Sequence, residues 1–216
     1  MTLTPELLAT REAILADGVF LCVRLSSDEQ LVESCRAAVR GGLSVLEITL
    51  TTPSALEAIA EMAKDDSAIV GAGTVLTQEQ VRDVAAAGAR FAMSPVLDES
   101  LVAAIHAHGM VAVPGIGSAT EALRAHRAGA SLVKVFPAQA LGGPDFLSAV
   151  AGPLPEISLV PTSGPKIRNF DKYVAAGAVA VGVGREVFEP DFTPVSVEAA
   201  ARRVRTAWDH ARKAHG

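Results

Sequence analysis

The chain has 216 residues, of which 50% are hydrophobic and 4% are aromatic. This length and hydropathy allow one domain with a sizeable core, and the many Ala, Val and Leu residues suit helices packed on strands, which favours an α/β fold. The formal net charge of −5, with no basic stripe along any predicted helix, excludes a polyanion-binding surface, so we expect no nucleic-acid partner.

The first predicted element is an N-terminal helix within residues 1–17, with Thr4 as its N-cap and Pro5 at its first helical position. This segment carries acidic residues in place of a basic region and an apolar signal core, and no apolar run reaches about 18 residues. We therefore expect a cytoplasmic protein that binds no membrane. Cys22 and Cys35 have neither a disulfide framework nor a metal-ligand spacing, which predicts buried free thiols and no metal site.

Eight short apolar runs come next, separated by Ala-rich amphipathic segments. Such runs are typical of parallel strands covered by helices on both faces. They are residues 18–25, 45–50, 68–73, 90–95, 110–115, 131–137, 157–162 and 178–184.

The joints between these segments also repeat. GGLSVLEI, AGARFAMS, AGASLVKV and AGAVAVGV each place a glycine after a helix and before a strand, as a left-handed C-cap requires. The period of roughly 20 to 28 residues predicts a (β/α)8 TIM barrel. We expect a single domain, 1–216, in which the N-terminal helix is a plug, residues 18–188 form the barrel core and a C-terminal helix, 195–213, is the eighth outer helix. A doubly wound sheet is disfavoured, because GAGTVL lacks the GxGxxG spacing.

Lys134 lies in the apolar run 131–137, and in a strand its side chain shares a face with Leu132 and Phe136. We expect it to point into the barrel near the carboxyl ends of the strands, where barrels of this type carry their active sites. Burial removes hydration from the ammonium and favours the free amine, which can attack a carbonyl.

Glu47, in VLEITL, faces opposite to its neighbours Leu46 and Ile48. Near an iminium it could act as the general acid/base that moves protons. The residues alone leave a second interpretation open, in which Lys134 and Glu47 form an inert structural ion pair.

The loops TSGP (162–165) and GVGRE (182–186) are small-residue turns that lead towards helices, a setting in which backbone N–H groups bind phosphate in barrels. Arg185 would add a phosphate contact or would be an exposed rim residue. His106, His108 and His126 have no metal-ligand spacing and are expected on solvated helix faces.

Taken together, these motifs resemble the 2-keto-3-deoxy-6-phosphogluconate (KDPG) aldolase family, with its relatives that act on 2-keto-3-deoxy-6-phosphogalactonate (KDPGal) and 4-hydroxy-2-oxoglutarate. The resemblance runs from about residue 18 to about residue 188. It implies a (β/α)8 barrel, typically trimeric, with a class I lyase activity of Entner–Doudoroff type on keto acid and aldehyde substrates and no cofactor. The motifs that carry it are LEITLTTP, VGAGTVLT, FAMSP, VPGIGSATEAL, VKVFPA, GGPDFLSAVAGPLP, VPTSGP and AVGVG.

Carried over residue by residue, the resemblance implies that Lys134 forms the Schiff base and that Glu47 is the general acid/base. It implies that Thr74 holds the pyruvate carboxylate and that Pro95 and Phe136 frame the reacting carbons. Thr49, at the end of the same run as Glu47, is expected at the substrate site as well.

The sequence departs from the family pattern at both ends of the substrate. Many members carry an arginine where this chain has Thr51, whereas another branch has threonine there and an arginine at the end of the first strand, which resembles Arg24. Because the first two strands are neighbours in a barrel, Arg24 is expected to reach the same carboxylate.

On the phosphate side, the usual PTGG is PTSGP here, which places Ser163 before Gly164, and the usual Gly-Ser after the eighth strand is Gly184-Arg185. Ser163 adds a Cβ where the backbone approaches a ligand closely. The sequence therefore predicts reversible cleavage of KDPG to pyruvate and glyceraldehyde 3-phosphate. A sister aldolase for 4-hydroxy-2-oxoglutarate or KDPGal is the first alternative, and a phosphosugar isomerase or synthase or a non-catalytic ligand-binding barrel is the second.

Overall fold

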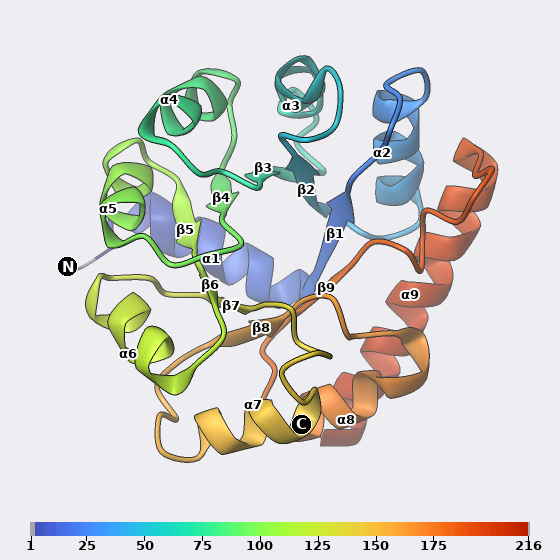
Figure 1. Ribbon diagram of the computed structural model, residues 1–216. Helices are drawn as coiled ribbons and strands as arrows, with labels where there is room; N and C mark the ends of the chain where they lie inside the picture. Colours follow the sequence, from blue (N-terminus) through green and yellow to red (C-terminus); the bar gives the residue numbers. More distant parts are fainter. Residues whose placement is uncertain (1–2, 216) are drawn as a thin grey trace.

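The computed structural model describes residues 3–215, in which helices surround a central group of short strands (Figure 1). The helices are α1 Pro5–Asp17, α2 Leu31–Arg40, α3 Ala55–Met62, α4 Gln78–Ala86, α5 Glu99–Ala107, α6 Ala119–Arg127, α7 Pro144–Ala151, α8 Phe170–Ala175 and α9 Pro194–His215, with a 3-10 turn η1 at Ile167–Asn169. The strands are β1 Val19–Val23, β2 Val45–Thr49, β3 Ile69–Gly73, β4 Phe91–Met93, β5 Val111–Val113, β6 Gly115–Ile116, β7 Val133–Val135, β8 Leu159–Pro161 and β9 Val181–Val183.

Each of the eight predicted apolar runs contains a parallel strand, and the fifth run is divided by Pro114 into β5 and β6. The strands form one sheet in the order β5-β4-β3-β2-β1-β9 and a second in the order β6-β7-β8. Between β8 and β9 only isolated parallel bridges are formed, from Leu159 to Ala178 and from Thr162 to Gly182. The fold is therefore α/β with parallel strands, and its pairing is divided between two sheets.

The predicted helix ends are confirmed. Thr4 caps α1, with its Oγ1 accepting a hydrogen bond from Leu7 N at 3.4 Å, and Gly18 closes the helix at φ 78°. The four joint glycines all adopt the left-handed conformation that the repeated pattern predicted, because a side chain there would meet steric strain. Their φ values are 95° at Gly42, 89° at Gly88, 98° at Gly129 and 94° at Gly177.

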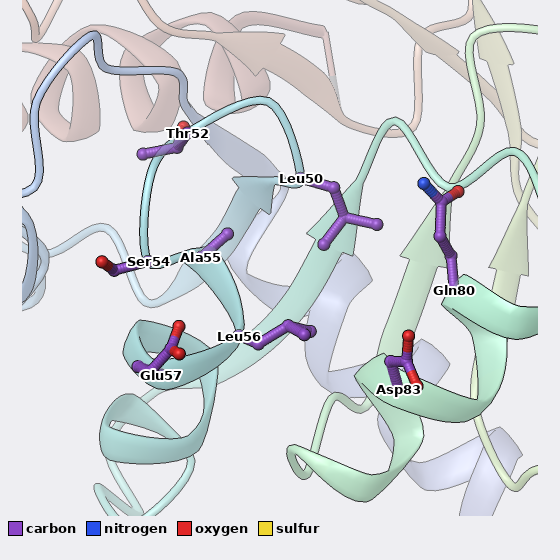
Figure 2. Close-up of a pocket in the computed structure, with 8 residues that line it drawn as sticks. All are labelled: Leu50, Thr52, Ser54, Ala55, Leu56, Glu57, Gln80 and Asp83. Atoms are coloured by element: carbon purple, nitrogen blue, oxygen red, sulfur yellow. The ribbon is translucent and has the colours of Figure 1, made fainter.

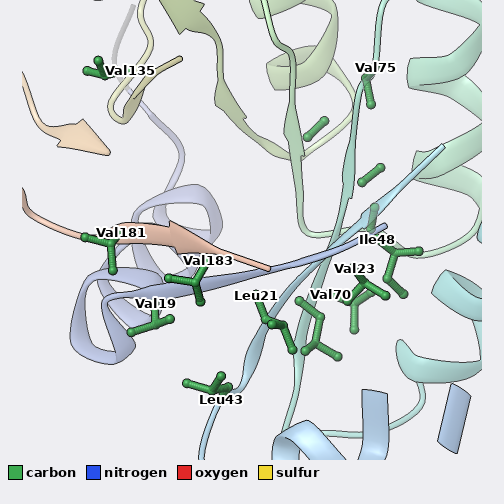
Figure 3. Packing of buried hydrophobic residues seen from close by; sticks show 14 of the residues in the cluster. Val19, Leu21, Val23, Leu43, Ile48, Val70, Val75, Val135, Val181 and Val183 are labelled. Atoms are coloured by element: carbon green, nitrogen blue, oxygen red, sulfur yellow. The ribbon is translucent and has the colours of Figure 1, made fainter. Parts of the chain in front are cut away.

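Buried residues divide into two clusters according to the face of the strand that carries them. Alternate residues such as Leu21, Ile48, Val70 and Val183 pack outward against the helices (Figure 3). The others, including Phe20 and Phe91, whose ring centroids are 5.3 Å apart, point inward. This alternation lets an inward polar residue share its strand with outward apolar ones.

Helix α1 covers the amino ends of the strands, because Leu7 and Ile14 belong to the inner cluster together with early strand residues such as Phe20. The N-terminal helix therefore packs on the inner cluster, as a plug would. Helix α9 packs against both α2, which follows β1, and α8, which precedes β9. Within residues 3–215, no helix combines the length and the apolar character needed to cross a membrane.

Candidate functional site

Lys134 and Glu47 meet inside the ring of helices although 87 residues separate them in the chain. Lys134 Nζ donates a hydrogen bond to Glu47 Oε1 at 3.1 Å, and the two side chains are only 6% and 1% exposed. Glu47 lies on β2 and Lys134 on β7, each flanked by outward apolar neighbours. The predicted inward orientation of both residues is therefore confirmed, and the arrangement suits either an ion pair or proton exchange with a bound ligand.

The space for the Glu47 carboxylate comes from a glycine on the next strand. A Cβ atom at Gly73 would lie 2.4 Å from Glu47 Oε1 and 2.7 Å from Glu47 Cγ. Real Cβ contacts do not reach such distances, so this position of the carboxylate requires glycine. The ring of Phe136 lies with its centroid 5.3 Å from Lys134 Nζ, within range of a cation–π contact.

Arg24 lies at the ends of the first three strands. It directly follows β1 and donates from Nη1 to Thr51 Oγ1 and from Nη2 to Thr74 Oγ1 at 3.0 Å. Thr74 adopts φ 61°, which turns the chain sharply after β3. The guanidinium thus joins the ends of the first three strands, and its exposed position leaves it able to receive a carboxylate.

Thr49, the last residue of β2, is fully buried and forms hydrogen bonds with the loop that follows this strand. Its Oγ1 lies 3.1 Å from both Thr51 Oγ1 and Thr52 Oγ1, and Thr52 in turn donates to the carbonyl of Val23 at 3.3 Å. The Thr49 hydroxyl is therefore occupied by hydrogen bonds within the loop. Through these bonds it holds the loop that carries Thr51, next to the Arg24 guanidinium.

Pro95 and Phe136 flank the same end of the strands. The backbone of Pro95 packs on Gly115, where an added Cβ would lie 2.4 Å from the Pro95 carbonyl carbon. Both side chains are partly exposed, which fits residues that border an opening.

The two predicted phosphate loops differ from each other. Ser163 is exposed with φ 61°, and its carbonyl accepts from Gln139 N at 3.1 Å. Gly164 is required by packing, because a Cβ there would lie 2.4 Å from the Tyr173 hydroxyl. This loop leads into the short turn η1.

The loop after β9 does not begin a helix, which corrects the sequence expectation for it. Val187 N and Phe188 N both donate to Gly184 O at 2.9 Å, forming a turn, and the next helix begins only at Pro194. Gly184 lies close to β1, since a Cβ there would be 2.8 Å from Cys22 O. Arg185 is exposed on this turn.

The two cysteines are free, but only Cys35 is fully buried. Cys22 is partly buried and is the register partner of Glu47 on the adjacent strand. Burial, and after it the charge of Glu47, raises the pKa of the Cys22 thiol to about 12. Burial alone raises the pKa of the Cys35 thiol to about 12. Both cysteines therefore remain thiols at neutral pH.

Two further groups show features that the sequence reasoning did not assign. Thr162 is buried at the end of β8, and its Oγ1 has no hydrogen-bond partner within residues 3–215. The position of Thr162 late in an apolar run was the sequence signal that could have identified it.

His106 is only 6% exposed, so the expectation that it lies on a solvated helix face was wrong, and burial lowers its pKa. Neither of its ring nitrogens has a hydrogen-bond partner among the described residues.

A separate hollow of about 320 Å³ lies between α3 and α4, outside the strands (Figure 2). Neither Lys134 nor Glu47 lines it. Its walls are Leu50, Thr52, Ser54, Ala55, Leu56, Glu57, Gln80 and Asp83. Among the residues described, no cluster of three or more His, Cys, Asp or Glu side chains could hold a metal ion.

Comparison with known proteins places this site in a family. The family described as "KDPG and KHG aldolase" matches residues 12–198. A 2-dehydro-3-deoxy-phosphogluconate aldolase of Treponema pallidum is 42% identical over 165 residues, which cover 76% of this chain and 79% of that protein. A KHG/KDPG aldolase of Escherichia coli K12 is 40% identical over 170 residues, covering 78% and 80%.

A solved structure of similar fold is the KDPG aldolase of Legionella pneumophila with pyruvate captured as a covalent carbinolamine intermediate. It superposes with a TM-score of 0.82 at 32% identity, covering 89% of this chain and 96% of that one. The matched residues include both β2, which carries Glu47, and β7, which carries Lys134. The chain belongs to the KDPG and KHG aldolase family of lyases.

Proposed function

We propose that the protein is a class I aldolase that reversibly cleaves KDPG to pyruvate and glyceraldehyde 3-phosphate. The observation that carries this proposal is the buried pair of Lys134 Nζ and Glu47 Oε1 at 3.1 Å, in a chain that belongs to an aldolase family. An amine and a carboxylate in contact inside an apolar setting can exchange a proton, which leaves a neutral nucleophile and a general acid.

In this mechanism the Lys134 amine attacks the C2 carbonyl of the substrate to give a carbinolamine, which loses water to form an iminium. The bond between C3 and C4 then breaks, its electron pair moves towards the iminium to form an enamine, and the C4 hydroxyl proton passes to Glu47. Glu47 returns the proton to C3, and hydrolysis of the second iminium releases pyruvate and the free amine. The positive iminium stabilises the developing carbanion, so the bond cleavage is assisted by the covalent intermediate itself.

Substrate binding in this proposal divides between two groups of residues. Arg24 and Thr74, which already form a hydrogen bond at 3.0 Å, hold the pyruvate carboxylate, while Pro95 and Phe136 border the reacting carbons. The phosphate contacts come from Ser163, Gly164, Gly184 and Arg185. The roles of Arg24 and Thr74 are supported by their shared hydrogen bond at the ends of β1 and β3, and the phosphate roles by the small-residue loops that follow β8 and β9.

Reduction of a trapped intermediate tests the proposal. Incubation with pyruvate and borohydride, followed by digestion and mass spectrometry, should give a reduced pyruvate adduct on Lys134. Lys134→Ala should abolish both the adduct and pyruvate release from KDPG, whereas Lys172→Ala, at an exposed lysine on α8, should change neither. A Lys134→Ala enzyme that kept full activity would refute the imine mechanism.

A second candidate function within the family is cleavage of 4-hydroxy-2-oxoglutarate or of KDPGal. The observation that favours it is the phosphate side, where Ser163 holds the left-handed φ of 61° usually taken by glycine and the loop after β9 forms a turn. Rates with KDPG, KDPGal and the unphosphorylated substrate, measured in parallel, separate these candidates.

We further propose that the two sheets act as one closed (β/α)8 barrel forming a single domain, and that the protein is a homotrimer of the cytoplasm. The bridges between β8 and β9 and the direct succession of β5 and β6 support the closed barrel. Three exposed apolar side chains support contact between subunits: Leu56 in the first turn of α3, Leu76 on the loop after β3 and Val96 on the loop after β4. Sedimentation at several concentrations tests the trimer.

A further inference from the structure

Glu186 connects the two loops that the proposed function assigns to the substrate phosphate. It lies on the turn that follows β9, and its Oε2 accepts a hydrogen bond from Ile167 N, at the start of η1, at 3.4 Å. Ile167 belongs to the segment that follows β8 and that begins with the loop of Ser163 and Gly164. The Glu186 side chain therefore reaches from one phosphate loop to the other.

The two charged residues on the β9 turn differ in exposure. Arg185 is exposed, whereas Glu186 is half-buried. The side chain packed between the loops is thus the carboxylate and not the guanidinium. Within residues 3–215, Glu186 takes part in no ion pair. Its negative charge is therefore not neutralised by a contacting cation in that part of the chain.

The segment after β8 has stronger supports than Glu186. The carbonyl of Ser163 accepts from Gln139 N at 3.1 Å. Asn169 closes the following turn, because its Oδ1 accepts from Lys166 N at 2.7 Å and its Nδ2 donates to Gly164 O at 3.3 Å. The Glu186 contact is the longest of these bonds, so we attribute to this residue an electrostatic effect and not the support of the loop.

A phosphate and an uncharged substrate end respond differently to such a carboxylate. A phosphate ester carries nearly two negative charges at neutral pH, and backbone N–H groups of loops can bind it. A carboxylate in the same loops repels it, because like charges interact over several ångströms at the reduced effective dielectric near a protein surface. A substrate that ends in a hydroxyl group experiences no such repulsion.

We propose that Glu186 is a specificity-determining residue whose charge limits the preference of the enzyme for a phosphorylated substrate. The substrate class then includes 2-keto-3-deoxy acids that end in a hydroxyl group as well as those that end in a phosphate. This inference rests on the proposed function, because it concerns the phosphate loops of the same aldolase.

Glu186→Gln tests this inference, because glutamine has the same shape and its carbonyl oxygen still accepts from Ile167 N. The ratio of kcat/KM for KDPG to kcat/KM for the unphosphorylated 2-keto-3-deoxygluconate should rise roughly tenfold, mainly through a lower KM for KDPG. Glu189→Gln, at an exposed carboxylate on the same loop, should leave the ratio unchanged. A ratio in Glu186→Gln within twofold of the wild-type value would overturn the inference.

Salt dependence separates the charge of Glu186 from any change in the shape of the loop. Added salt screens interactions between charges near the surface. The difference in ratio between the wild type and Glu186→Gln should therefore shrink severalfold when the KCl concentration rises from about 0.05 M to about 0.5 M. A difference that persists unchanged at high salt would mean that the substitution acts through loop shape, and the electrostatic role would be overturned.

Binding of inorganic phosphate gives a readout that does not require aldolase activity. In isothermal titration calorimetry, Glu186→Gln should bind inorganic phosphate severalfold more tightly than the wild type, and Glu189→Gln should not. If the wild type traps no pyruvate on Lys134 but phosphate binding strengthens in Glu186→Gln, the aldolase proposal fails and the role of Glu186 stands. If pyruvate is trapped and phosphate binding is unchanged, the role of Glu186 fails and the aldolase mechanism stands.

Discussion

Gly73→Ala tests how closely the glycine on β3 determines the position of the Glu47 carboxylate. The new Cβ would lie 2.4 Å from Glu47 Oε1, and ordinary contacts begin at 3.4 Å, so the carboxylate must move by about 1 Å. Since Oε1 is the atom that contacts Lys134, we expect a loss of roughly 100-fold in kcat/KM, the usual cost of misplacing a reacting group by about 1 Å. Overpacking should also destabilise the fold by about 1–3 kcal/mol.

Pyruvate release coupled to lactate dehydrogenase measures the first effect, and thermal unfolding measures the second. The control is Gly117→Ala, where the nearest atom to the new Cβ is Leu141 Cδ2 at 3.6 Å and the backbone is not left-handed. If Gly73→Ala kept kcat/KM within twofold of the wild type, as we expect for Gly117→Ala, the argument that the Gly73 backbone fixes Glu47 would be wrong.

Three further predictions concern the rest of the chain. Ser163→Gly should raise the free energy of unfolding by up to about 1 kcal/mol, because φ 61° strains a residue with a Cβ, and a lower melting temperature would contradict this. His106→Leu should reduce the acid sensitivity of the fold: burial lowers the pKa of His106, so the unfolded chain binds its proton more readily, and stability is lost as pH falls below about 6.5. Urea unfolding of both proteins from about pH 8 to about pH 5 should show the wild type losing more stability than the variant. Arg24→Lys should raise KM for KDPG by tenfold or more with a smaller change in kcat, because an ammonium does not reproduce the fork that contacts Thr51 and Thr74, and an unchanged KM would remove Arg24 from the carboxylate site.

Much of the local structure could be predicted from the sequence because its causes are local. The left-handed glycine joints, the cap at Thr4 and the alternating faces of the strands all follow from the conformational limits of single residues and from a period of two. For this reason the inward positions of Lys134 and Glu47 were predictable, and so was the position of Arg24 at the end of the first strand.

Burial and close approach were not predictable, because they depend on which elements become neighbours. His106 was expected in solvent but is buried on α5, and the second phosphate loop was expected to start a helix but forms a turn at Gly184. The interruption of the pairing at Pro114 also depends on how the sheet curves and not on the apolar pattern of the run.

The sequence by itself determined the order of elements, the inward faces of the strands and the kinds of chemical group that those faces carry. Only the tertiary structure decided that Lys134 Nζ lies 3.1 Å from Glu47 Oε1, that Gly73 makes room for this contact and that Cys22 lies opposite the same carboxylate. The physical reason is that the register between strands and the curvature of the sheets set the distances between inward side chains. Both are properties of the assembled strands, whereas a pattern along one strand fixes only the face on which a residue lies.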